Sequence, residues 1–297
     1  MKKDYSNNLQ SWLSAFRLRT LPLATASISL GSFLAASENS FQWQTAILCF
    51  LTAVILQILS NLANDYGDSL HGADSTHRQG PQRAVQSGKI SKSAMRIALI
   101  LFILLALIMG YILIREESVI FYVLGILAVI AALTYTIGPN PYGYAGLGDI
   151  FVLIFFGIIG VFGSYYLQTH AFNVQIFFPA IACGLFCVAV LNINNIRDLK
   201  SDKLAGKNTI PVRLGETKAR IYHWLLLLTG LTCALIFTFL NYKSVWQFLF
   251  LINIPLLFSN GFGISLKFKA ADLDPYLKQM AIITLLFSFS FGVGILL

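Results

Sequence analysis

The stretch FLTAVILQILSNLANDYGDSLHGADSTHRQGPQR, residues 50–83, runs from an apolar segment into a cluster of charged residues. Its apolar part belongs to a run over residues 43–63, which is long enough for a helix to cross about 30 Å of hydrocarbon. The charged part holds three acids and two arginines: Asp65, Asp68, Asp74, Arg78 and Arg83. The stretch therefore predicts a membrane helix with a highly polar end.

Helical spacing places several polar side chains at this end on one face. Residues three and four apart are neighbours on a helix, so a helix that continues past Asn61 brings together Asn61, Asn64, Asp65 and Asp68. Acids clustered at the end of a membrane helix resist burial and need a cation or a polar cavity. Mg²⁺ prefers oxygen ligands and is usually held by few carboxylates together with substrate phosphates. We therefore predict a Mg²⁺–diphosphate site at the membrane surface; the alternative is a solvated helix end with ordinary capping Asp residues.

A second stretch, VAVLNINNIRDLKSDKLAGKNTIPVRLG at residues 188–215, repeats the pattern. An apolar run again ends in asparagines, and Asp198 and Asp202 follow at a spacing of four, on one helical face. A basic loop that contains Lys203 and Lys207 comes next. Two accidental helix caps are a poor explanation for two such copies. We predict that the copies face each other and hold two Mg²⁺ ions between their carboxylates.

The composition indicates an all-α integral membrane protein. Hydrophobic residues make up 57% of the 297 and charged residues 11%, whereas a soluble domain carries about 25% charged residues. The apolar runs do not alternate with polar residues as the strands of a membrane barrel do. Nine runs are long enough to predict membrane helices: 20–37, 43–63, 94–114, 119–137, 149–168, 174–194, 222–240, 245–266 and 279–297.

The basic residues predict the orientation in the membrane. With the amino terminus in the cytoplasm and nine alternating spans, 19 of the 21 Lys and Arg residues lie on the inner side. Only Arg115 and Lys243 lie on the outer side. Both Asp-rich stretches then face the cytoplasm, and the net charge of +8 needs no nucleic-acid partner. Neither the four Cys nor the four His residues have the spacing of a zinc site.

The spacing of the two polar helix ends predicts the internal organisation of a single domain, residues 1–297. They belong to the second and sixth spans, which suggests two repeated halves at about 10–140 and 141–266 and a closing helix at 279–297. We expect a central cavity that opens to the cytoplasm and also sideways to lipid.

Three other features have two explanations each. Arg78 and Arg83 can offer forked donors to phosphate oxygens, but basic residues are also general in cytoplasmic loops. Asp149 precedes the fifth span, where an acid is favourable to the helix dipole; alternatively it lines a substrate pocket together with a tyrosine. In the last inner loop, Asp272 and Asp274 fit a loop and helix start better than a third metal site.

Three motifs resemble the UbiA superfamily of intramembrane prenyltransferases, and within it the branch that acts on dihydroxynaphthoate. NDYGDSLHGADSTHRQGPQR is similar to that branch's NDYGDxxxGxDxxxRxGPxR, and NNIRDLKSDKLAGKNTIPVRLG to its NNxRDxxxDxxxGKxTxxVRLG. The central YTIGPNPYGYAGLGD is similar to YTGGPxPxxYxGLGD, with Ile137 in place of a glycine. Gly72 stands where the general superfamily pattern has its last Asp, and Asp74 follows two residues later, as in the naphthoate branch.

The resemblance implies a nine-helix UbiA-like bundle in the bacterial cytoplasmic (inner) membrane. It implies transfer of a polyprenyl chain from polyprenyl diphosphate to 1,4-dihydroxy-2-naphthoate, with loss of CO₂ and diphosphate, in menaquinone biosynthesis. Mg²⁺ is the implied cofactor. No obligate protein partner is expected.

The resemblance also implies roles for single residues. The metal ligands would be Asp65, Asp68, Asp198 and Asp202, with the oxygens of Asn64 and Asn194 beside them and Asn61 and Asp74 as further candidates. The diphosphate would contact Arg78, Arg83 and Lys207. The ring of Tyr135 would stabilise the allyl cation, and Asp149 or a nearby tyrosine would orient or deprotonate the acceptor.

The sequence is also compatible with two alternative functions. The acceptor can be another aromatic compound, such as 4-hydroxybenzoate. A cation-coupled secondary transporter would carry intramembrane acids near the middle of its spans, whereas the acids of this chain lie at helix ends on one side.

Overall fold

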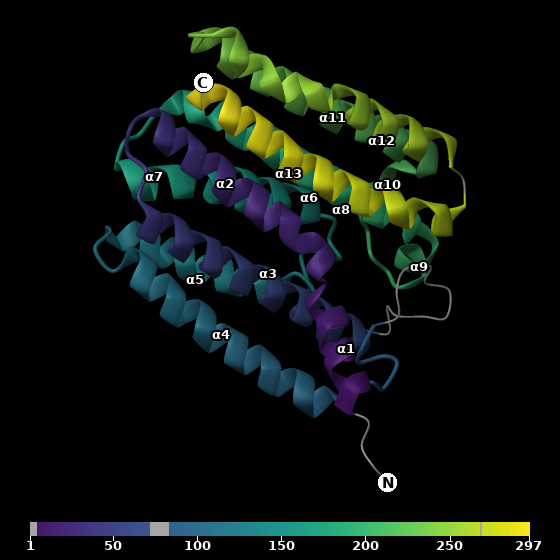
Figure 1. Cartoon of the computed structure of the whole chain (residues 1–297). Helices are drawn as coiled ribbons and strands as arrows, with labels where there is room; N and C mark the ends of the chain where they lie inside the picture. Colours follow the sequence, from purple (N-terminus) through teal and green to yellow (C-terminus); the bar gives the residue numbers. More distant parts are fainter. Residues whose placement is uncertain (1–4, 72–82, 268) are drawn as a thin grey trace.

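The computed structural model describes residues 5–71, 83–267 and 269–297, and every regular element in these ranges is helical. The long helices lie side by side in one bundle, with the short helices α1 (Tyr5–Phe16) and α9 (Leu199–Leu204) at the same end (Figure 1). The all-α class predicted from the composition is confirmed. Asp74 and Arg78, both predicted to belong to the site, lie outside the described residues.

Eight helical segments of the described chain are long and apolar enough to cross a membrane. They are Leu9–Ser37, Trp43–Leu70, Lys92–Ile114, Gly148–Thr169, Val174–Arg197, Glu216–Leu240, Val245–Leu266 and Ala270–Leu296. These segments identify an integral multi-pass membrane protein. The predicted span at residues 119–137 forms a helix of 16 residues, α5 (Val119–Thr134), with a rise of about 24 Å. Because α5 is shorter than the usual span, the count of nine stays a prediction.

Each long segment corresponds to one helix or to a chain of shorter ones. The continuous helices are α2 (Leu21–Ser37), α3 (Trp43–Leu70), α4 (Lys92–Ile114), α8 (Phe177–Arg197), α11 (Glu216–Leu240) and α13 (Asp274–Leu296). The fifth predicted span is α6 (Gly148–Val152), the π-helical η2 (Leu153–Gly163) and α7 (Ser164–Thr169). The eighth is η4 (Val245–Asn253) and α12 (Ile254–Leu266).

Two clusters of buried apolar side chains hold the bundle together. The larger one lies between α2, η2, α8, α11 and α13 and includes Phe186 and Phe287. The smaller one joins α1, α3 and α4 around Leu62 and Met95. Since lipid is as apolar as these clusters, close van der Waals packing stabilises them rather than transfer out of water. The helix α2 packs against α13 and η2 as well as against α3, so its contacts are not confined to the first half of the chain. The division into two repeated halves stays a prediction.

Close contacts bring the segment between α5 and α6 against the end of α3. A Cβ on Gly67 would lie 2.6 Å from the carbonyl oxygen of Thr136, so only glycine allows this approach. The Thr136 hydroxyl donates to the carbonyl of Ala63 at 2.9 Å. On the other side, the amide of Asn208 donates to the carbonyl of Tyr144 at 2.8 Å. The segment therefore links the end of α3 to the loop that follows α9.

Candidate active site

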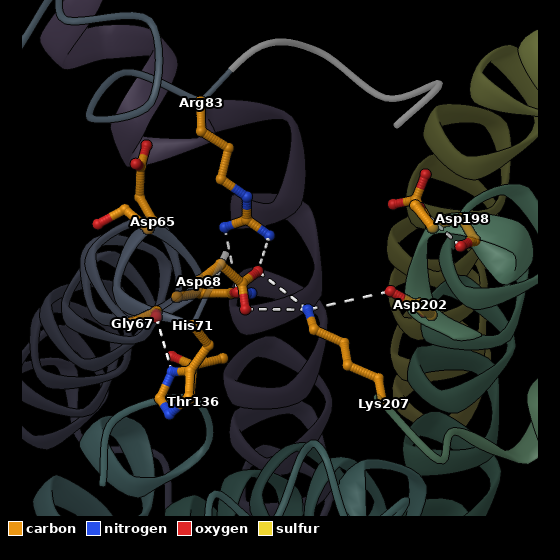
Figure 2. Close-up of polar contacts among 12 residues, drawn as sticks. Asp65, Gly67, Asp68, His71, Arg83, Thr136, Asp198, Asp202 and Lys207 are labelled. Atoms are coloured by element: carbon orange, nitrogen blue, oxygen red, sulfur yellow. Dashed lines mark hydrogen bonds and ion pairs between the residues drawn. The ribbon is translucent and has the colours of Figure 1, made fainter. Parts of the chain in front are cut away.

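The two Asp-rich stretches meet at one end of the bundle. The ammonium nitrogen of Lys207 lies 2.9 Å from a carboxylate oxygen of Asp68 and 3.9 Å from one of Asp202, so it stands between the two motifs (Figure 2). Asp68 comes from α3, whereas Asp202 and Lys207 come from α9 and the loop after it. The predicted convergence of these helix ends is therefore present in the structure.

A small polar cavity, open at its mouth, lies where the motifs meet. Eight of the predicted site residues line it: Asn64, Asp68, Arg83, Tyr135, Asn194, Asp198, Asp202 and Lys207. Further lining residues that sequence reasoning did not single out include Tyr144, Asn195 and Thr209. All three lie inside the quoted motifs, so membership of a motif is the feature of the sequence that could have identified them.

At the first motif, the charge of Asp68 is balanced by groups from three other segments. Arg83 forms an ion pair with it, Lys207 approaches both of its oxygens, and the Tyr144 hydroxyl donates to it at 2.9 Å. Arg83 also donates to the side-chain oxygen of Asn64 at 3.1 Å. The Asp68 carboxylate is almost fully buried, so these partners replace the water that it loses.

At the second motif, the charge of Asp198 is balanced by the residue before it. Arg197 donates to both carboxylate oxygens of Asp198, at 2.9 and 2.7 Å, and to the side-chain oxygen of Asn194 at 2.7 Å. Its remaining terminal nitrogen donates to Asp274 at 2.6 Å. Sequence reasoning assigned no role to Arg197 and treated Asp274 as a loop residue, because the contact spans 77 positions of the chain.

Asp65 and Asn61, predicted beside Asp68, are directed to other contacts. The two oxygens of Asp65 accept hydrogen bonds from the backbone amides of Ala84 and Val85, at 3.0 and 3.2 Å. The amide of Asn61 donates to the carbonyl of Phe16 and to the hydroxyl of Thr20. Neither residue lines the cavity. In this arrangement Asp65 anchors the chain that leads into α4, and Asn61 ties α3 to the start of α2.

Tyr135 lies at the cavity among several acids. Desolvation of its hydroxyl, the neighbouring Tyr142 and the charges of Asp68, Asp202 and Asp149 raise the pKa of Tyr135 well above its ordinary value. The phenol therefore stays protonated at neutral pH. Its ring is available to the cavity as a neutral aromatic surface.

Asp149, predicted as a substrate-pocket residue, is buried at the start of α6 and does not line this cavity. Its carboxylate accepts a hydrogen bond from the Tyr222 hydroxyl of α11 at 2.9 Å. Gly148, the residue before it, packs against the ring of Tyr135. The pair of Asp149 and Tyr222 is thus connected to the cavity through the contact between Gly148 and Tyr135. Sequence reasoning missed Tyr222 because 73 residues separate it from Asp149.

The donor set of the cavity fits a hard divalent cation that is completed by its substrate. Among the described residues, no three acidic, His or Cys side chains come close enough to hold a metal ion by themselves. Carboxylate and amide oxygens from both motifs nevertheless line one cavity, and an ammonium group occupies the position between Asp68 and Asp202. The buried hydroxyl of Thr209 has no hydrogen-bond partner among the described residues. Such a site suits Mg²⁺, which keeps few protein ligands and shares substrate phosphates.

Comparison with known proteins identifies relatives over the whole chain. A protein named 1,4-dihydroxy-2-naphthoate octaprenyltransferase, from Haemophilus influenzae, is 44% identical over 304 aligned residues that cover 100% of this chain and 99% of that protein. The apo structure of a UbiA homolog from Aeropyrum pernix superposes with a TM-score of 0.72 at 15% identity, over 93% of this chain and 98% of that one. A UbiA homolog from Archaeoglobus fulgidus bound to DMAPP and Mg²⁺ superposes with a TM-score of 0.68 at 17% identity, over 96% and 99%. Residues 24–273 match the UbiA prenyltransferase family, and the chain belongs to that family.

Proposed function

We propose that the protein transfers a polyprenyl chain from polyprenyl diphosphate to 1,4-dihydroxy-2-naphthoate and thereby makes demethylmenaquinol. In this reaction the C–O bond to the diphosphate breaks, a C–C bond forms at the aromatic ring, and the ring carboxylate leaves as CO₂. The full-length relative at 44% identity supports the choice of acceptor.

The observation that carries the proposal is the meeting of both Asp-rich motifs at one cavity. An ammonium group between Asp68 and Asp202 indicates that this position favours a positive charge shared by two helices. A diphosphate and its cations need such a position, because the leaving group develops charge as the C–O bond breaks. A solvated helix end would not bury three acids beside one cavity.

Mg²⁺ is the proposed cofactor, as in the Archaeoglobus fulgidus structure. The carboxylates of Asp68, Asp198 and Asp202 would hold it, with the oxygens of Asn64 and Asn194 beside them. When bound, it neutralises the charge of the leaving diphosphate. Asp65 and Asn61 support the site from outside the cavity, and a metal role for Asp74 stays a prediction.

The basic residues of the cavity change partners when substrate binds. Arg83 and Lys207 neutralise Asp68 in the substrate-free protein. With Mg²⁺ held by the carboxylates, Arg83 and Lys207 would donate to phosphate oxygens in place of Asp68. Arg78 stays predicted as a third such contact.

The acceptor is proposed to lie against Tyr135, between the cavity and the pair of Asp149 and Tyr222. The protonated Tyr135 presents its ring to the allyl cation. Asp149, held by the Tyr222 hydroxyl, orients the acceptor hydroxyl and accepts its proton. The surrounding apolar helices exclude water, which would otherwise capture the cation.

The proposed location is the bacterial cytoplasmic membrane. The amino terminus and the motif-bearing end of the bundle then face the cytoplasm, in accord with the distribution of Lys and Arg. The prenyl chain of the substrate would lie in or beside the lipid bilayer, because it is itself a lipid.

The experiment is prenyl transfer by the purified protein in lipid nanodiscs with Mg²⁺ and a mixture of polyprenyl diphosphates. Dihydroxynaphthoate and 4-hydroxybenzoate are supplied in parallel reactions. We expect a prenylated naphthoquinol, release of pyrophosphate in equal amount, and no product once a chelator has removed divalent cations. Product from 4-hydroxybenzoate alone would contradict the acceptor, and substrate uptake without pyrophosphate would contradict the reaction class.

A further inference from the structure

We infer that Asp274, the first residue of α13, is a positioning residue that fixes the cavity carboxylate of Asp198 through Arg197. The inference rests on the proposed function, in which Asp198 holds the metal–diphosphate complex. Asp274 does not line the cavity. It acts through the guanidinium group that stands between it and Asp198.

The geometry of Arg197 gives this guanidinium a single orientation. Its side chain is 0% exposed, and all three of its nitrogens donate: to both oxygens of Asp198, to the oxygen of Asn194 and to Asp274. A guanidinium is planar, so these bonds fix one another's directions. Two of its partners, Asp198 and Asn194, line the cavity. Rotation of Arg197 would therefore turn cavity oxygens.

Asp198 needs a fixed cation because of its place in the fold. It is the residue at which α8 ends and the short helix α9 begins, so the carbonyl end of one helix, which disfavours a negative charge, and the amide end of the next, which favours it, meet there. It is also buried, at 4% side-chain exposure. The forked pair with Arg197 replaces the hydration that the buried carboxylate loses.

Asp274 holds the outer nitrogen of Arg197 from a different part of the chain. Without the charge of this carboxylate, the bond to that nitrogen is an ordinary one in place of a charge-assisted one, and the guanidinium could turn toward other acceptors. Asp274 itself sits in the first turn of α13, where an acid is stabilised, and it accepts a second ion pair from Arg19 at 3.1 Å. Asp274 thus ties the position of the Asp198 carboxylate to α13 and, through Arg19, to the start of α2.

A matched control exists in the same bundle. Glu216 also holds a buried arginine, Arg220, which in turn reaches the carbonyl of Ile264 on α12. This pair likewise braces two helices, but none of its members lines the cavity. Glu216→Gln therefore reports the effect of losing a brace without any effect on Asp198.

The test measures binding of Mn²⁺ in the presence of inorganic pyrophosphate, by EPR titration of the protein in nanodiscs. We expect Asp274→Asn to weaken Mn²⁺ binding roughly 10-fold, the size typical for loss of a group that orients a metal ligand. Asp274→Glu should restore most of the affinity. Glu216→Gln should lower the melting temperature by a similar amount to Asp274→Asn but leave Mn²⁺ binding as in the wild type.

A double-mutant cycle separates positioning through Arg197 from any independent role. In an Arg197→Met background, Asp274→Asn should cause no further loss of Mn²⁺ affinity, because the intermediary is already absent. Unchanged Mn²⁺ affinity in Asp274→Asn, or an equal loss in Glu216→Gln, would overturn the inference while leaving the proposed function intact. A wild-type protein that binds no Mn²⁺ with pyrophosphate would overturn the proposed function itself, and the inference with it.

Discussion

Asp68 at the end of α3 and Asp198 at the end of α8 are both buried acids on one cavity, yet their counter-charges come from different places. The cations beside Asp68 are Arg83 and Lys207, which belong to the connections after α3 and α9. The cation beside Asp198 is Arg197, the last residue of α8, and Asp274 of α13 forms a second ion pair with it. The first motif is thus neutralised by loops, and the second by the helix bundle.

This difference indicates how the site could receive a diphosphate together with its metal ions. Loop cations can leave Asp68 for phosphate oxygens, because only local loop movement is needed. Arg197 cannot leave Asp198 without leaving a buried charge unpaired, which costs several kcal/mol. We therefore propose that the first motif exchanges its partners on binding, while the second stays in place and sets the geometry.

The largest expected effect is the loss of either buried carboxylate at the cavity. Asp68→Asn and Asp198→Asn should each lower kcat/KM for transfer by about 100-fold or more, since removing one electrostatic contact to developing charge typically has this effect. Transfer assays on nanodisc samples check this. The exposed Asp272 provides the control, and Asp272→Asn should retain wild-type transfer. Near-normal activity in either cavity variant would break the comparison between the two motifs.

A smaller effect is expected when a loop cation is removed. Lys207→Met should raise the KM for polyprenyl diphosphate roughly 10-fold, because a charge-assisted hydrogen bond contributes about 1.5–3 kcal/mol. Steady-state kinetics at saturating acceptor measure it. Lys203→Met removes an exposed lysine from the same region and should leave KM unchanged. If Lys207→Met also leaves KM unchanged, the loop cations do not exchange onto the substrate.

The contrast between Asp65 and Asp68 sharpens the assignment of metal ligands. Asp65→Asn weakens the hydrogen bonds that the backbone amides of Ala84 and Val85 donate to this side chain. The free energy of unfolding should therefore fall by about 1–3 kcal/mol. The affinity for Mn²⁺ with pyrophosphate should stay within about 3-fold of wild type, because Asp65 is not on the cavity. A loss as large as that in Asp68→Asn would restore Asp65 to the ligand role predicted from its spacing.

The smallest expected effect concerns the Tyr135 hydroxyl. Its raised pKa keeps the phenol protonated up to and beyond its ordinary ionisation range, so its ionisation should not limit activity below about pH 10. Tyr135→Phe, which keeps the ring, should change kcat only a few-fold and leave the alkaline limb of the pH–rate profile in place. Tyr135→Leu removes the ring and should cost roughly 10-fold. An alkaline limb that disappears in Tyr135→Phe would show that the hydroxyl titrates during catalysis.

Sequence spacing predicted the helix ends and most of the cavity because these features depend on local order. Apolar runs fixed α3 and α8, and the i, i+3 and i, i+4 rule placed Asn64 and Asp68 on one face, where the structure has them lining the cavity. The same rule could not separate Asp65 from Asp68. Which of two neighbouring acids meets the following chain depends on the path of residues after Arg83, and spacing contains no information on that path.

Contacts between distant segments account for what the sequence did not predict. The pairs Asp149–Tyr222 and Arg197–Asp274 arise only once α11 and α13 pack against α6 and α8. The helix at the predicted span 119–137 ends at Thr134, three residues before the end of the apolar run. Gly138 at φ 117° and the prolines Pro139 and Pro141 follow, and they favour a turn there. The structure also assigned Asp274 a partner that its place in a loop did not suggest.

The most direct measurement is an experimental structure of the protein with Mg²⁺ and an unreactive polyprenyl diphosphate analogue. We expect one diphosphate in the cavity, with metal contacts to the carboxylates of Asp68, Asp198 and Asp202 and with Lys207 moved from Asp68 to a phosphate oxygen. Arg197 should keep its contacts to Asp198 and Asp274. A diphosphate bound to the residues of one motif alone, with Lys207 still paired to Asp68, would contradict a shared metal–diphosphate site.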